Sequence, residues 1–123
     1  MKQPSLWRSF GHAIDGVVRT WTRERNFRLH VAVAVAVALM SVMLRISRVE
    51  WAVLVFAMGL VFTAELFNTT VEAAVDLLSP EYHETAKTAK DAAAGAVLLS
   101  ALTAAIVGLI ILGPPLWQFI RGL

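Results

Sequence analysis

Residues 65–76 read Glu65-Leu66-Phe67-Asn68-Thr69-Thr70-Val71-Glu72-Ala73-Ala74-Val75-Asp76, a short stretch with three carboxylates and an amide. They continue an apolar run, residues 51–64, that contains no turn signal, so they extend the same helix. At about 100° per residue, Glu65, Glu72 and Asp76 project within roughly 40° of one another, with Asn68 at their flank. Each ionisable group at membrane depth costs roughly 2.5 kcal/mol or more on insertion scales. A metal ion, a partner charge or a polar cavity must therefore offset the cost of this acidic face.

The composition is that of a membrane protein with a single domain over residues 1–123. Hydrophobic residues make up 58% of the chain and charged residues 16%, and the mean hydropathy is +0.67. Soluble domains carry about 25% charged residues. The chain has no cysteine, which excludes disulfides, thiolate metal sites and a thiol nucleophile. Residues 1–28 lack the short apolar core of a signal peptide, so the spans themselves are expected to direct insertion.

The N-terminal residues predict an amphipathic helix over 5–27. Apolar side chains recur at helical spacing, and basic and small polar side chains fill the opposite side. Beside membrane spans, such a helix is expected to lie in the plane of the membrane interface. The alternative is a helix that packs on a partner protein.

Three longer apolar segments predict membrane-spanning helices, so the fold class is an all-α integral membrane protein. The first span, residues 29–45, alternates valine and alanine as a strand can. It is nevertheless too long for an ordinary strand and just long enough to cross a bilayer as a helix. The remaining segments are a second span at 51–78, a polar loop at 79–91 and a third span at 92–120.

Turn residues set the ends of these segments. Ser79-Pro80 ends the second span, with Ser79 a candidate cap and Pro80 at a first helical position, so the later part of the loop is expected to be helical. The third span is expected to close at Gly113-Pro114-Pro115.

The basic residues are distributed unevenly between the two sides of the membrane. Eight of the 11 Lys and Arg residues lie in residues 1–28 and 79–91, and three lie on the other side. This bias places the N-terminus and the 79–91 loop in the cytoplasm. The acidic face then lies at the cytoplasmic end of its span, beside Lys90-Asp91 and Glu24. Glu24 is one carboxylate among arginines, and an anchor for anionic headgroups does not need it.

These residue types suit phosphoryl transfer at a membrane surface. Carboxylate and amide oxygens suit Mg²⁺, which is bound by one or two carboxylates together with substrate phosphates. Lys and Arg neutralise transferring phosphates, and a free carboxylate can take a proton from a hydroxyl. The chain has neither a Walker-type glycine-rich loop nor a protein-kinase signature. A non-catalytic subunit that conducts protons or cations would use a similar carboxylate face and is the alternative.

The chain contains the pattern Glu65-x-x-Asn68-Thr69-x-x-Glu72-x-x-x-Asp76. It is preceded by Glu24-Arg25-Asn26-Phe27-Arg28 and followed by Glu81-Tyr82-His83 and Ala89-Lys90-Asp91-x-Ala93-Ala94-Gly95-Ala96-Val97. Together these motifs resemble the prokaryotic diacylglycerol kinase family. This family includes undecaprenol kinases, and the resemblance covers nearly the whole chain. It implies a homotrimer of three-span subunits with an N-terminal surface helix and active sites between subunits. The implied reaction uses Mg²⁺ and ATP to phosphorylate a lipid hydroxyl.

The resemblance also implies residue roles. Glu65 matches the catalytic base, and Glu24 and Glu72 match metal-binding carboxylates. Acceptor lipid is expected at Arg28, Glu65 and Asn68, and Asp76 supports the site. The residues expected at the nucleotide are Glu24, Asn68, Glu72, Tyr82, His83, Glu84, Lys90 and Asp91.

Undecaprenol is the first choice of acceptor and diacylglycerol the alternative. The run Arg25-Asn26-Phe27-Arg28-x-His30 and residues 91–97 are more similar to the Gram-positive branch of the family, where undecaprenol is the usual acceptor. Ser5, His12 and His30 depart from the well-known diacylglycerol enzyme, which has an Arg, a Tyr and an acidic residue there. The expected partners are nucleotide, lipid alcohol and the bilayer of the cell membrane, with no nucleic acid.

Overall fold

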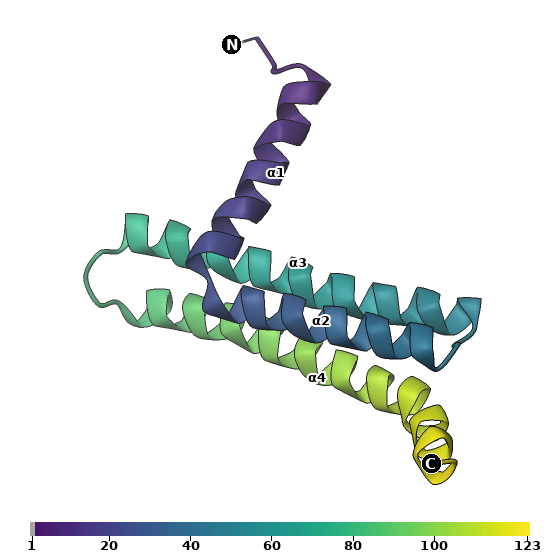
Figure 1. The fold of residues 1–123 in the computed structure, drawn as a ribbon. Helices are drawn as coiled ribbons and strands as arrows, with labels where there is room; N and C mark the ends of the chain where they lie inside the picture. The colour runs from purple at the N-terminus through teal and green to yellow at the C-terminus, as the bar shows by residue number, and fades with distance from the viewer. Residues whose placement is uncertain (1) are drawn as a thin grey trace.

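The computed structural model describes residues 2–123, and over this range the chain is all-helical (Figure 1). Helices α2, α3 and α4 lie side by side and alternate in direction, whereas α1 projects away from them (Figure 1). These three helices are each long and apolar enough to cross a membrane. The prediction of an all-α membrane protein with three spans is therefore confirmed. The helices are α1 (Leu6–Arg23), α2 (Arg25–Met43), α3 (Arg48–Leu78) and α4 (Glu84–Arg121).

Helix α1 ends four residues earlier than the helix predicted over 5–27. Glu24 has an extended backbone (φ −103°, ψ 108°), and α2 begins at the next residue. Nη1 of Arg28 donates hydrogen bonds to the carbonyl oxygens of Trp21 (2.7 Å) and Thr22 (3.2 Å). The last carbonyls of a helix lack partners within the helix, so Arg28 stabilises the corner that lets α1 leave the bundle.

The short connection between α2 and α3 is fixed by a capping box. Ser47 Oγ accepts a hydrogen bond from the Glu50 amide (3.2 Å), and Glu50 Oε1 accepts one from the Ser47 amide (3.1 Å). Arg45, with φ of 54°, reverses the chain just before this cap. These contacts start α3 at Arg48, three residues before the span predicted from 51.

The connection between α3 and α4 is shorter than the predicted loop at 79–91. Ser79 is the C-cap of α3 rather than a cap for the next helix, since its amide donates to the Val75 carbonyl at 2.8 Å. The N-cap of α4 is His83, whose Nδ1 accepts a hydrogen bond from the Thr85 amide at 3.1 Å. Pro80 therefore lies in the turn rather than at a first helical position, whereas residues 84–91 form the first two turns of α4, as predicted for the later part of the loop.

Helix α4 ends at Arg121, one residue beyond the predicted end of the third span at 120, and it runs through Gly113-Pro114-Pro115, where the span was expected to close. A proline removes one backbone donor and bends a helix rather than always ending it. Figure 1 shows this end of α4 turning away from the line of the other helices. In lipid there is no water to bind freed carbonyl groups, which favours the bent helix over an unwound chain.

Candidate active site

The acidic face forms the continuation of the buried side of α3. Glu65 is only 3% exposed, although it is ionisable. Asn68 and Glu72 are half-buried on the following turns, and Asn68 Nδ2 donates a hydrogen bond to Glu72 Oε1 at 3.3 Å. Asp76 is exposed at the end of the helix. These side chains follow one another along one face of α3, and their exposure increases from Glu65 to Asp76.

Glu24 joins this group from the break between α1 and α2. It is half-buried, and both Glu24 and Glu72 lie close enough to Glu65 to repel a negative charge on its carboxylate. Three carboxylates from two separate parts of the chain therefore converge. Carboxylates gather in this way where a cation offsets their repulsion or where one of them holds a proton.

Three buried oxygen atoms on one turn of α3 have no hydrogen-bond partner within residues 2–123: Glu65 Oε1, Asn68 Oδ1 and Thr69 Oγ1. The first two accept hydrogen bonds or bind hard cations such as Mg²⁺. Among the described residues, no group of three or more His, Asp or Glu side chains could hold a metal ion. Asn68 Oδ1, together with the carboxylates of Glu24 and Glu72, fits a Mg²⁺ ion that takes its other ligands from phosphates of a substrate, and Glu65 Oε1 is left free to accept a proton.

His30 of α2 contacts the buried carboxylate, with its Nε2 3.1 Å from Glu65 Oε1. The atoms are within reach of each other, but their geometry falls outside that of a full hydrogen bond. His30 is not among the residues predicted from the sequence to form the site. The available signal was that His30 is the one titratable residue within 29–44, and ionisable residues inside a span often mark a functional site.

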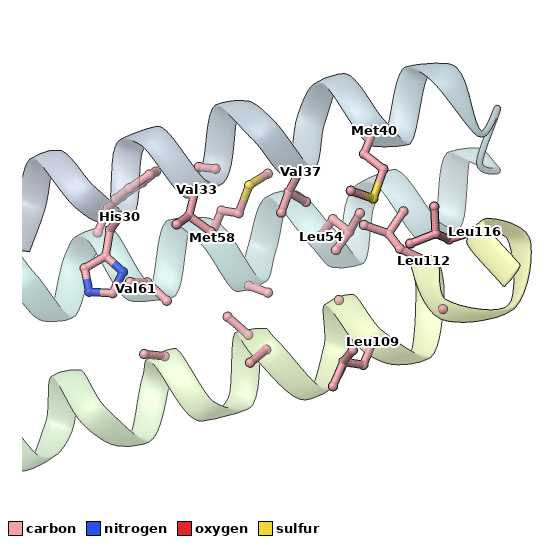
Figure 2. A pocket seen from close by; sticks show the side chains of 18 residues that line it. His30, Val33, Val37, Met40, Leu54, Met58, Val61, Leu109, Leu112 and Leu116 are labelled. Carbon is pink, nitrogen blue, oxygen red and sulfur yellow. The ribbon is translucent and has the colours of Figure 1, made fainter. Parts of the chain in front are cut away.

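An apolar groove of about 610 Å³ runs between α2, α3 and α4 and begins at His30 (Figure 2). Figure 2 shows His30 at one end and Met40, Leu112 and Leu116 at the other. The other residues that line the groove are alanines, valines, leucines, methionines, glycines and one phenylalanine. His30 is therefore the one titratable residue among those that line it. The groove thus offers a long apolar surface that ends beside Glu65.

A cationic side chain of α4 pairs with the exposed end of the acidic face. Lys90 Nζ forms an ion pair with Asp76, and it also lies near Glu72. Lys87, one turn earlier, pairs instead with Asp91. Lys90 therefore approaches the exposed end of the acidic face, whereas Asp91 is engaged on its own helix.

Comparison with known proteins decides the class of this site. The family model described as prokaryotic diacylglycerol kinase matches residues 11–112. The chain belongs to the prokaryotic diacylglycerol kinase family. It is a lipid kinase, and the non-catalytic alternative is set aside.

This kinase is similar both to an undecaprenol kinase and to diacylglycerol kinases. It is 43% identical over 111 residues to an undecaprenol kinase of Bacillus subtilis, covering 90% of each chain. It is 46% identical over 114 residues to a diacylglycerol kinase of Synechocystis, covering 92% of this chain and 65% of that one. A diacylglycerol kinase of Escherichia coli strain K12 is 34% identical over 103 residues, covering 83% of this chain and 84% of that one.

Some residues expected at the site of this kinase lie apart from the acidic face. Tyr82, 81% exposed, and Glu84 lie in or next to the turn between α3 and α4, and His83 caps α4. Within residues 2–123, none of the three makes an ion pair or side-chain hydrogen bond to the acidic face. Arg28 holds the end of α1. A single subunit therefore gathers the carboxylates and Lys90 but not the whole expected nucleotide set.

Proposed function

We propose that this lipid kinase transfers the γ-phosphoryl group of ATP to the hydroxyl of undecaprenol, giving undecaprenyl phosphate and ADP. The observation that carries the proposal is the position of Glu65. Its carboxylate is buried, lacks a hydrogen-bond partner at Oε1 and lies beside His30 at the end of an apolar groove. A long apolar chain with a terminal hydroxyl matches such a groove.

In this reaction Glu65 acts as the general base. Its carboxylate takes the proton of the acceptor hydroxyl while the hydroxyl oxygen bonds to the γ-phosphorus, and the bond from that phosphorus to the ADP oxygen breaks. The buried environment excludes water, which would otherwise compete as acceptor. Asn68 and Arg28 are assigned to the acceptor side of the site.

Glu24 and Glu72 would hold Mg²⁺, with Asn68 Oδ1 as a further oxygen donor. When bound, Mg²⁺ neutralises charge on the nucleotide phosphates. Lys90 provides a cation for the same phosphates, and Asp76 orients Lys90 through their ion pair. The residues assigned to the rest of the nucleotide are Tyr82, His83, Glu84 and Asp91.

The assembly is proposed to be a homotrimer in the cell membrane, with the N-terminus and residues 79–91 in the cytoplasm. The distribution of basic residues supports this orientation. The separation of Tyr82, His83 and Glu84 from the acidic face within one subunit supports a site that needs residues from a second subunit. The α1 helix, with large apolar side chains exposed along one side, then lies on the membrane surface.

Diacylglycerol is the second candidate acceptor, because two of the relatives above carry that name. The test uses purified protein in lipid, labelled ATP, Mg²⁺ and either alcohol. We expect labelled lipid phosphate with both and a kcat/KM that is higher with undecaprenol. A higher kcat/KM with diacylglycerol would reverse the choice of acceptor, and no labelled product with either alcohol would exclude both.

A further inference from the structure

The buried carboxylate of Glu65 is held by one neighbour. Among residues 2–123, His30 is its one polar side-chain contact, at 3.1 Å between Nε2 and Oε1. The other titratable groups near it, Glu24 and Glu72, repel its negative charge. A general base must be held within about 0.5 Å of its working position, and the repulsion from these two neighbours does not provide that.

An aromatic contact between α2 and α3 lies one turn from His30 and Glu65. Phe27 precedes His30 by one turn of α2, and Phe62 precedes Glu65 by one turn of α3; their ring centroids lie 5.7 Å apart. Phe27 is 5% exposed. This aromatic pair ties the two helix turns that carry His30 and Glu65 to each other, so neither side chain needs a long reach to make the contact.

His30 also lies where the groove meets the carboxylate. Its side chain is 28% exposed, compared with 4% for that of Glu65, and Figure 2 shows the imidazole at the end of the groove. An acceptor alcohol that fills the groove would bring its hydroxyl to this end. The imidazole is therefore placed to aim the Glu65 carboxylate at that hydroxyl.

We propose that His30 is a positioning residue for Glu65, donating its Nε2–H to the carboxylate, in the lipid-kinase reaction proposed above, on which this role rests. The present 3.1 Å contact, without full hydrogen-bond geometry, is of the kind that tightens when substrates bind. His30 thus acts on the acceptor through Glu65 and leaves the nucleotide site unchanged.

The first test compares three substitutions at His30 in the full chain, with undecaprenol, Mg²⁺ and ATP. Gln places an amide nitrogen about as far out as Nε2, Asn is too short, and Leu has no donor. We expect H30L and H30N to lower kcat on the order of 10- to 100-fold, with the KM for ATP within about twofold of wild type. H30Q should keep kcat within about threefold of wild type, because it restores the donor.

The control is Val35→Leu, at an exposed position of α2 outside the groove, with 53% of the residue exposed. It should leave kcat unchanged, and melting in detergent should show that all variants are folded. Wild-type kcat in H30L, or a loss in H30Q as large as in H30L, would overturn the positioning role.

A second measurement does not depend on catalysis. The imidazole ¹⁵N resonances of His30 should shift in Glu65→Gln and stay in place in Val35→Leu. An unchanged His30 signal in Glu65→Gln overturns the proposal. A shifted signal in a protein that phosphorylates neither undecaprenol nor diacylglycerol would keep the His30–Glu65 contact and reject the proposed reaction, so the two failures are distinguishable.

Discussion

The two halves of α3 use one helix face in opposite ways. In the first half, Leu54, Ala57 and Val61 are buried and apolar, at spacings of three and four residues. Glu65 occupies the next position of the same series, and Asn68 and Glu72 continue it. The face therefore packs the bundle over its first part and then becomes the acidic face. Burial of apolar side chains stabilises, whereas burial of a carboxylate costs free energy, so the second half is built for function at the expense of stability.

The largest effect should come from replacing the first polar residue of this series. Glu65→Gln should lower kcat by about 10²- to 10⁴-fold, the usual contribution of a general base. Nucleotide affinity should stay unchanged. The melting temperature should stay equal or rise, because an amide is cheaper to bury than a carboxylate. Activity assays, nucleotide titration and thermal unfolding in detergent measure the three quantities.

The matched control for Glu65→Gln is Glu50→Gln on the same helix. A Gln at this position keeps the capping box, so both activity and melting temperature should be retained. Loss of nucleotide binding in Glu65→Gln would instead make Glu65 a metal ligand.

A substitution in the apolar first half of α3 should instead lower the stability of the protein. Leu54→Ala removes a side chain that is 2% exposed and should destabilise the protein by about 2 to 3 kcal/mol. Because Leu54 also lines the groove, the KM for the lipid alcohol should rise while the KM for ATP is kept. Val55→Ala, at a position that is 58% exposed, is the control and should change neither. An unchanged melting temperature in Leu54→Ala would show that the buried apolar face of α3 does not stabilise the helix bundle.

Periodicity within one helix was readable from the sequence, and contacts between helices were not. Helix geometry alone placed Glu65, Glu72 and Asp76 on one face. The distribution of basic residues placed Glu24 at the same membrane face as the acidic stretch, and the family resemblance gave it a metal-binding role. How close Glu24 comes to Glu65 depends on packing between helices, which the sequence does not show. The His30–Glu65 contact was missed for the same reason, since it depends on how α2 rests on α3.

The errors at helix ends have a local cause. Ser79 and Pro80 are common start signals, but His83 provides the cap through Nδ1, and histidine is not among the favoured cap residues. Residues 84–91 then join α4 because they are rich in alanine and lysine and add the Lys87–Asp91 pair at four-residue spacing. Pro114 and Pro115 do not stop α4 in an apolar setting.

Glu72 tests whether the acidic face has separate roles along its length. Glu72→Gln should weaken binding of Mg²⁺-nucleotide by roughly tenfold, as expected for a lost or weakened metal ligand, with a smaller effect on kcat at saturation. Nucleotide titration at several Mg²⁺ concentrations measures this, and Glu81→Gln, in the turn beyond the face, is the control. Equal affinity in Glu72→Gln and wild type would remove Glu72 from the metal site.

Asp76, at the exposed end of the series, should matter least. Its ion pair with Lys90 joins side chains that are 66% and 40% exposed, and exposed pairs contribute roughly 0 to 1 kcal/mol. Asp76→Asn should therefore lower stability by less than about 1 kcal/mol and raise the KM for ATP about two- to threefold, since Lys90 stays present but is less well oriented. High salt should weaken the pair in wild type and so narrow the difference. A rise in KM as large as that in Glu72→Gln would make Asp76 a direct ligand and extend the metal site to the end of α3.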